Sequence, residues 1–202
     1  MKRKILMITC GGTIAKTYSE SEAVLENVKP MVEKIVDQLR LPNVQVSYNH
    51  LMHKDSLDMD DKDRNAVVQC IKEAMRHSHL DGIIVIQGTD TLPNTGEAIY
   101  DAFPNAKLPI VLTGAMKPFV IQGSDALQNI AESIFSIHFL NSGTHVVMHG
   151  NICHLPGVTK NRSTLTFENS EEKRQKAELK NGIHKKWLAG FNQYNKDKSL
   201  SC

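Results

Sequence analysis

Ile83-Ile84-Val85-Ile86-Gln87-Gly88-Thr89-Asp90-Thr91 is an apolar, β-favouring run that ends abruptly in small polar residues. Such a run predicts a strand that is buried on both faces and is followed by a turn at its carboxyl end. Ligands of open α/β sheets bind outside the carboxyl ends of the strands, so Thr89 and Asp90 are candidate site residues. The same pattern occurs near the start of the chain, where apolar residues 5–10 lead into Gly11-Gly12-Thr13. Two such strand ends predict a site in which hydroxyl groups face a small ligand.

The composition is that of an ordinary globular protein. The chain has 202 residues, of which 41% are apolar and 23% are charged, and this length fits one domain or one domain with an appendage. A formal net charge of +2 and an aromatic content of 5% argue against a basic, base-stacking surface. No apolar run approaches the roughly 18 residues that a bilayer-spanning helix needs. We therefore expect neither a nucleic-acid partner nor a membrane partner.

The cysteines and the first residues bear on the compartment. The four cysteines, at positions 10, 70, 153 and 202, are widely spaced and form no C-x-x-C pair. This pattern favours incidental thiols of a reducing compartment over a disulfide framework or a zinc site. The basic start Met1-Lys2-Arg3-Lys4 imitates a signal peptide, but the apolar run after it is too short for one. We expect a cytoplasmic protein without a metal or other cofactor.

Strands and helices are expected to alternate along most of the chain. The predicted strands lie near residues 3–10, 43–50, 83–86, 109–114 and 144–148. The predicted helices lie near 29–39, from about 58–61 past Met75, near 94–102, and from about 124 to 139. This alternation predicts an α/β fold with three layers around a parallel, flavodoxin-like sheet.

Three local expectations complete this outline. The polar segment between Gly11 and Asn27 is expected to be a long loop of the kind that often acts as a lid. Ser124 or Asp125 is expected to cap the last predicted helix, with no chemical role for Asp125. Residues 1–168 are expected to form the folded domain, and residues 169–202 to form a charged tail that is partly helical.

Five short motifs occur in a fixed order, each at a predicted strand end or loop. They are Gly11-Gly12-Thr13-Ile14, Asp55-Ser56-Leu57-Asp58-Met59, Gly88-Thr89-Asp90-Thr91, Thr113-Gly114-Ala115-Met116 and Val158-Thr159-Lys160-Asn161. Each motif alone is a weak signal, but the ordered set over residues 3–168 resembles the amino-terminal domain of the bacterial-type L-asparaginase family. The chain most resembles the short members of that family, which have this domain alone.

The resemblance implies catalytic roles for several residues. Thr13 matches the family's nucleophile, and Tyr18 resembles the lid tyrosine that orients it. Thr89, Asp90 and Lys160 match the family's Thr-Asp-Lys arrangement. Thr13 is the preferred first nucleophile and Thr89 its rival. A threonine hydroxyl needs a neighbouring base, and Lys160 could serve as that base only in its neutral form.

The resemblance also implies a set of substrate-binding positions. These are Asp55, Ser56, Gly12, Gly88 and Ala115. Glycines at two of them would let the backbone approach a ligand closely. Leu57 stands where full-length members often have a glutamine. The family's carboxyl-terminal domain, which lends an acidic residue to a neighbouring subunit's site, is expected to have no counterpart here, so recognition of a free α-ammonium group would rest largely on Asp90.

The implied function is hydrolysis of the side-chain amide of asparagine or a related small amide, through an acyl-threonine. The expected assembly is a homo-oligomer, a dimer or larger. Two alternatives stay open at this point. The chain could be a small-amide or amino-acid binding module with little turnover, or it could be the amidase subunit of a larger amidotransferase.

Overall fold

The computed structural model describes residues 2–19, 24–27, 31–77, 79–171 and 175. Within these residues the main sheet has six strands in the order β4-β1-β5-β6-β7-β8. Their bounds are β1 Arg3–Gly11, β4 Val44–Lys54, β5 Gly82–Ile86, β6 Pro109–Thr113, β7 Gly143–Met148 and β8 Asn151–His154. The sheet is parallel except at its edge, where β8 runs antiparallel to β7. The predicted α/β class is confirmed, and the antiparallel edge strand is a correction to the all-parallel expectation.

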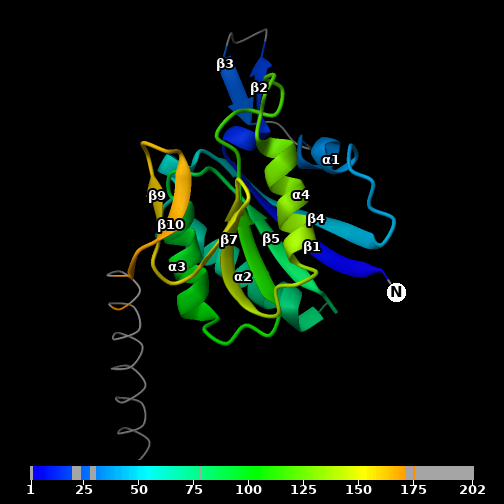
Figure 1. Ribbon diagram of the computed structural model, residues 1–202, viewed down its shortest axis with the longest axis vertical. Helices are drawn as coiled ribbons and strands as arrows, with labels where there is room; N and C mark the ends of the chain where they lie inside the picture. The colour runs from blue at the N-terminus through cyan, green and yellow to red at the C-terminus, as the bar shows by residue number, and fades with distance from the viewer. Residues whose placement is uncertain (1, 20–23, 28–30, 78, 172–174, 176–202) are drawn as a thin grey trace, which may run out of the picture.

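Helices cover both faces of this sheet (Figure 1). They are α1 Met31–Val36, α2 Asp61–His77, α3 Leu92–Ala102 and α4 Ala126–Ser136. The central strand β5 explains why two layers of helices are needed. Its residues Ile83 and Val85 pack with α2 and α3, whereas Ile84 and Ile86 pack with α1 and α4. Because successive side chains of a strand point to opposite faces, an unbroken apolar strand must be covered on both sides.

Two small antiparallel hairpins stand outside the main sheet. The strands β2 Lys16–Ser19 and β3 Val24–Asn27 follow a short 3-10 helix, η1 Thr13–Ala15. The strands β9 Val158–Asn161 and β10 Thr166–Asn169 pair near the end of the described chain. Figure 1 shows the β2–β3 hairpin projecting beyond the rest of the domain. The expectation of a long loop over 11–27 was therefore wrong in its described parts, and the strands β8, β9 and β10 were not among the predicted strands.

Several element ends differ from the sequence predictions for local reasons. The strand β4 continues to Lys54, because β1 pairs with it as far as Gly11↔Lys54. The helix α4 stops at Ser136, because the following turn tightens to short-range bonds such as that from the His138 N–H to the Phe135 carbonyl. The partly helical tail expected over residues 169–202, with an amphipathic helix around Leu179 and Leu188, lies almost entirely outside the described residues. Over the described ranges, no helix combines the length and the apolar character needed to cross a membrane.

Candidate active site

Lys160 joins two side chains that follow the central strand of the sheet. Its Nζ donates a hydrogen bond of 2.8 Å to the Thr89 hydroxyl and lies 2.9 Å from Oδ1 of Asp90. Thr89 is buried, the Lys160 side chain is 10% exposed, and the Asp90 side chain is 32% exposed. Arg162 adds a longer ion pair of 3.6 Å to the same Asp90 oxygen. The structure thus brings together three of the predicted catalytic residues from segments far apart in the sequence.

The β9–β10 hairpin carries Lys160 to this place because the hairpin is anchored in the core. Val158 and Phe167 are buried in the same apolar cluster as α2 and α3. The Gly157 N–H donates a 2.6 Å hydrogen bond to Glu97 on α3, which fixes the start of the hairpin. Burying these two apolar side chains contributes a free energy on the order of 1.5–3 kcal/mol each, which stabilises the short hairpin against α3.

The backbones of three strand ends approach one another beside this cluster. A Cβ built on Gly12 would lie 2.1 Å from the Gly88 nitrogen, and one built on Gly88 would lie 2.7 Å from the Ser56 Oγ. Gly12 has a φ of +85°, which L side chains rarely adopt. Only glycine fits at both positions, so the ends of β1 and β5 meet the segment after β4. The pattern Gly-Thr at two strand ends therefore reflects a real close approach.

This approach of Gly12 to Gly88 places Thr13 near Thr89, Asp90 and Lys160, although no hydrogen bond between described residues joins Thr13 to them. Thr13 begins η1, is half-buried, and directly follows Gly12. Tyr18 lies on β2 with 58% of its surface exposed. The hydrogen bonds of the site thus link Thr89, Asp90 and Lys160, whereas Thr13 is brought near through the Gly12–Gly88 backbone contact. The roles of Thr13 and Tyr18 stay predictions.

The predicted substrate-binding residues lie around the same strand ends. Ser56 begins the short 3-10 helix η2 Ser56–Asp58, is 1% exposed, and has an Oγ without a hydrogen-bond partner among the described residues. Its carbonyl accepts a 2.7 Å hydrogen bond from the Thr91 hydroxyl, which ties η2 to the turn after β5. A buried hydroxyl of this kind is available to a ligand.

Asp55 already has partners of its own. Its Oδ2 lies 2.7 Å from Nζ of Lys16 on β2, and its Oδ1 accepts from the Leu57 N–H. The Lys16 hydrogen bond is the main reason that the pKa of Asp55 lies below its ordinary value. Lys16 was missed by the sequence analysis, because nothing local signals a partner 39 positions away. Leu57 is 67% exposed beside this pair.

The segment after β6 closes the other side of the cluster. Ala115 is fully buried, and a Cβ on Gly114 would lie 3.2 Å from Cγ2 of Thr89. The Thr89 hydroxyl lies 3.5 Å from the Met116 sulfur. Met116 is the last residue of the Thr113–Met116 motif, but the motif did not predict its contact with Thr89.

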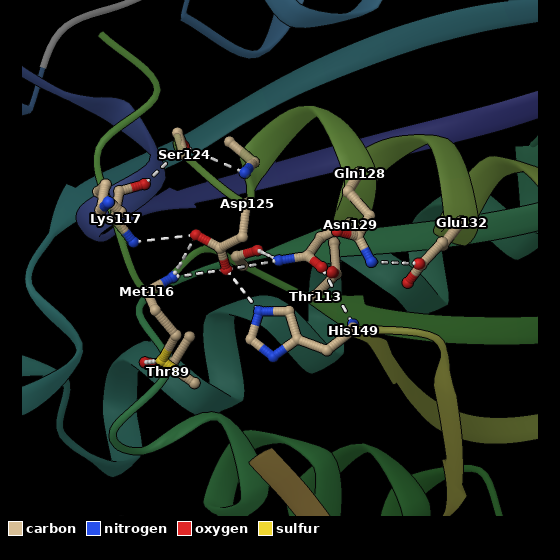
Figure 2. Close-up of polar contacts among 12 residues, drawn as sticks. Thr89, Thr113, Met116, Lys117, Ser124, Asp125, Gln128, Asn129, Glu132 and His149 are labelled. Atoms are coloured by element: carbon tan, nitrogen blue, oxygen red, sulfur yellow. Dashed lines mark hydrogen bonds and ion pairs between the residues drawn. The ribbon is translucent and has the colours of Figure 1, made fainter. Parts of the chain in front are cut away.

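Asp125 does not cap α4 with its side chain, contrary to expectation. Its carboxylate instead accepts hydrogen bonds from the Met116 and Lys117 N–H groups and from His149 (Figure 2). Ser124 takes the capping role, since its Oγ accepts from the Ala126 N–H. His149 received no role from the sequence, and only its place at the end of β7 could have drawn attention to it.

Cys10 can be set aside as a nucleophile. It lies at the end of β1, is fully buried, and its pKa is raised to about 12 by burial and by the nearby Cys70 and Asp63. The thiolate is the reactive form of cysteine, and this thiol holds its proton at neutral pH. The hydroxyls of Thr13 and Thr89 are the candidate nucleophiles at these two strand ends.

Comparison with known proteins agrees with this picture. The family model described as "Asparaginase, N-terminal" matches residues 4–187. The chain is 28% identical to the L-asparaginase of Thermococcus kodakarensis over 115 residues, covering 57% of this chain and 34% of that protein. It is 26% identical to L-asparaginase 2 of Bacillus subtilis over 171 residues, covering 80% of this chain and 45% of that protein. The chain thus spans about half the length of these relatives or less.

Solved structures show the same relation. The thermostable L-asparaginase from Thermococcus kodakarensis superposes with a TM-score of 0.73 at 26% identity, covering 82% of this chain and 51% of that one. A probable cytoplasmic L-asparaginase from Campylobacter jejuni gives a TM-score of 0.69 at 22% identity, covering 84% and 54%, and shares the fold. The family match spans most of the chain, and the fold agrees with it. The chain belongs to the asparaginase amino-terminal-domain family.

Proposed function

We propose that this chain is an amidohydrolase that converts the side-chain amide of asparagine, or a closely related small amide, to the acid and ammonia. The observation that carries the proposal is Lys160, held between the Thr89 hydroxyl and the Asp90 carboxylate in a largely buried position. Hydrolysis of an amide needs a nucleophile, a base and a set of hydrogen-bond donors. This cluster supplies a hydroxyl and an amine, with backbone N–H groups nearby.

The proposed reaction has two steps. A threonine Oγ attacks the amide carbon, the neutral amine of Lys160 accepts the hydroxyl proton, and that proton passes to the leaving nitrogen as the C–N bond breaks. Ammonia leaves and an acyl-threonine ester remains. Water then attacks the ester carbon, which releases the carboxylic acid and restores the hydroxyl. Thr13 is the proposed first nucleophile, and Thr89 is the proposed hydroxyl through which Lys160 acts.

The remaining groups suit the recognition of an amino acid. The unpartnered Ser56 hydroxyl is proposed to bind the α-carboxylate, and Asp90 the α-ammonium group. Asp55 is proposed to position η2 through Lys16, and the glycines at 12 and 88 to let the ligand approach the backbone. Ala115 is proposed to line the site beside Thr89. No metal or cofactor enters the proposed reaction.

We also propose that the protein works in the cytoplasm as a homo-oligomer. Large apolar side chains are exposed at Tyr18, Leu57, Val120, Ile121, Phe135, Phe139 and Leu165. Exposed apolar groups of this kind favour association. Sedimentation of the purified chain at micromolar concentration is expected to give a dimer or larger species, and a monomer would contradict this assembly.

The test of the function is ammonia release from L-asparagine and L-glutamine by the purified chain. Wild-type protein is expected to release ammonia, and Thr89→Val is expected to lose at least about 99% of the rate, as removal of an acid–base partner typically costs 10²-fold or more. Thr164→Val is the matched control, because Thr164 lies exposed in the β9–β10 turn and bonds Thr166. Binding of L-aspartate without any release of ammonia from either amide would overturn the proposal in favour of a binding module.

A further inference from the structure

Asp125 holds the segment that follows β6 from outside the Lys160 cluster. Both carboxylate oxygens accept from the Met116 N–H, at 3.1 and 2.9 Å, and Oδ1 also accepts from the Lys117 N–H at 3.0 Å. Figure 2 shows the carboxylate between this backbone on one side and His149 with Asn129 on the other. A carboxylate that accepts several N–H bonds fixes the backbone that donates them.

His149 and Asn129 fix the carboxylate in turn. Nε2 of His149 lies 2.7 Å from Asp125 Oδ2, and the Asn129 amide nitrogen lies 2.8 Å from the same oxygen. Since a carboxylate only accepts, His149 carries its proton on Nε2. Asn129 is fully buried. Its side chain also donates to the Gly114 carbonyl and accepts from the backbone N–H of His149. The network therefore joins the ends of β6 and β7 through α4.

The backbone of His149 indicates that this arrangement is imposed on the chain. Its φ is +55°, a region that residues other than glycine seldom occupy. Such a conformation costs free energy and persists only where surrounding contacts fix it. Here the hydrogen bonds to Asn129 and Asp125 are those contacts.

The segment held by Asp125 touches the hydroxyl that Lys160 contacts. A Cβ built on Gly114 would lie 3.2 Å from the Thr89 methyl carbon, and the Met116 sulfur lies 3.5 Å from the Thr89 Oγ1. Thr89 thus has Lys160 on one side and the 114–116 segment on the other. A shift of that segment would leave Lys160 as the side-chain hydrogen-bond partner of the Thr89 hydroxyl within the described part of the chain.

We propose that Asp125 and His149 are positioning residues that set the orientation of the Thr89 hydroxyl through Met116. The inference rests on the proposed function for its kinetic consequence. Neither residue touches the reacting atoms. Their loss is expected to reduce kcat on the order of 10- to 100-fold, because small misplacements of reacting groups cost this much. KM is expected to change less than kcat, because, of the proposed substrate-binding positions, only Ala115 lies on the segment that Asp125 holds.

The variants separate positioning from folding. Asp125→Asn keeps the shape of the side chain but replaces one accepting oxygen with an NH₂ group. That group donates, so it cannot accept the hydrogen bonds that the Asp125 carboxylate receives. His149→Asn tolerates the positive φ but is too short to reach Asp125, whereas the longer His149→Gln can donate to it and is expected to restore most of the rate. Glu132→Gln is the control, because Glu132 lies on the same helix and bonds Gln128 and the Gly150 N–H. Circular dichroism gives the folded fraction of each variant.

A second readout does not depend on turnover. Methionine methyl groups labelled with ¹³C give one resonance for each of the eight methionines, and Met116→Leu identifies the signal of Met116. Thr89→Val defines the position of that signal when the hydroxyl is absent. Asp125→Asn and His149→Asn are expected to move the Met116 resonance, while Glu132→Gln and His149→Gln leave it near its wild-type position.

The outcomes distinguish this inference from the proposed function. A wild-type Met116 resonance in folded Asp125→Asn and His149→Asn overturns the inference, and so does a wild-type kcat in either of them. If the wild-type protein releases no ammonia, the proposed function fails. The methionine resonance alone then decides whether Asp125 and His149 position Met116 against Thr89.

Discussion

Nζ of Lys160 lies 2.8 Å from the hydroxyl oxygen of Thr89, although 71 positions separate them in the sequence. The contact exists because β5 delivers Thr89 to the carboxyl edge of the sheet and the β9–β10 hairpin folds back over α3. The lysine side chain is largely buried, and its Nζ contacts the Thr89 hydroxyl and the Asp90 carboxylate. This pair is the centre of the proposed chemistry.

The first prediction concerns which threonine becomes acylated. Acid quenching of the protein during turnover of L-asparagine, followed by proteolysis and tandem mass spectrometry, is expected to find an acyl ester on Thr13. The reason is that Thr13 begins η1 beside the Gly12–Gly88 contact and is more accessible than the buried Thr89. Thr13→Ala is expected to abolish the adduct. An adduct on Thr89 in the wild-type protein would reverse the two assignments.

The second prediction concerns the link between Lys16 and Asp55. Lys16→Met is expected to raise KM by up to about fivefold, with a smaller change in kcat, because partly exposed ion pairs are worth about 0.2–1 kcal/mol. Lys16→Arg keeps the positive charge and is the matched control. The difference between wild type and Lys16→Met is expected to shrink at high salt, since screening weakens exposed pairs. Identical KM values at low salt would show that the pair does not hold η2 for substrate.

The third prediction uses two glycines with similar backbones and different surroundings. Gly12 has a φ of +85° and its Cβ would lie 2.1 Å from the Gly88 nitrogen, whereas Gly150 has a φ of +73° and open space around it. Gly150→Ala therefore incurs only the backbone cost of positive φ, about 1–2 kcal/mol. Gly12→Ala is expected to lose more stability and nearly all activity. Urea unfolding checks this, and equal losses for the two variants would contradict the close approach at Gly12.

The fourth prediction concerns acid and Asp125. Burial favours the neutral form of Asp125, but hydrogen bonds from the Met116 N–H, His149 and the Lys117 N–H outweigh it, so the pKa lies below the ordinary value of 3.8. A depressed carboxyl pKa contributes stability above the unfolded-state pKa, and this stability is lost as the pH falls through the folded-state pKa. Asp125→Asn is therefore expected to be less stable than wild type by about 1–3 kcal/mol at pH 7.

The same difference is expected to narrow as the pH falls below the ordinary carboxyl pKa of 3.8, because Asp125 then takes up a proton in the unfolded chain while the folded carboxylate, with its lower pKa, is still ionised. Urea unfolding at pH 7 and in steps down to pH 2.5 measures it. Asp61→Asn is the control, because the Asp61 side chain is 95% exposed. A stability difference for Asp125→Asn that stays constant down to pH 2.5 would contradict the depressed pKa.

The main sheet and its helices were predictable because they depend on local patterns. An apolar strand such as β5 must be buried on both faces, and a helix such as α2 shows its buried stripe at Val67, Val68 and Ile71. The strands β8, β9 and β10 were missed because each has only four residues and a mixed composition. The β2–β3 hairpin was missed because Lys16–Ser19 is polar and shows no alternation.

The site divides in the same way. Thr89 and Asp90 were predicted as site residues because they follow the end of a buried strand. The close approach of Gly12 to Gly88 agrees with the Gly-Thr pair at each of the two strand ends. Lys160 was found only by resemblance, since an isolated lysine in a short hairpin is ordinarily a surface residue. Asp125, His149, Met116 and Lys16 depend on tertiary contacts that no local pattern encodes. The boundary at residue 168 between domain and tail stays a prediction.

The most direct test of the account is the rate of ammonia release from L-asparagine by Lys160→Met at equal folded concentration. Lys107→Met serves as the control, because Lys107 is exposed just before β6 begins. It therefore lies at the amino end of that strand, whereas the site lies at the carboxyl ends of the strands. Lys160→Arg adds a third arm, since arginine stays protonated and cannot supply the neutral amine that acts as the base. The account predicts a loss on the order of 100-fold or more for both Lys160 variants, and a wild-type rate for Lys107→Met. A wild-type rate in folded Lys160→Met would contradict it.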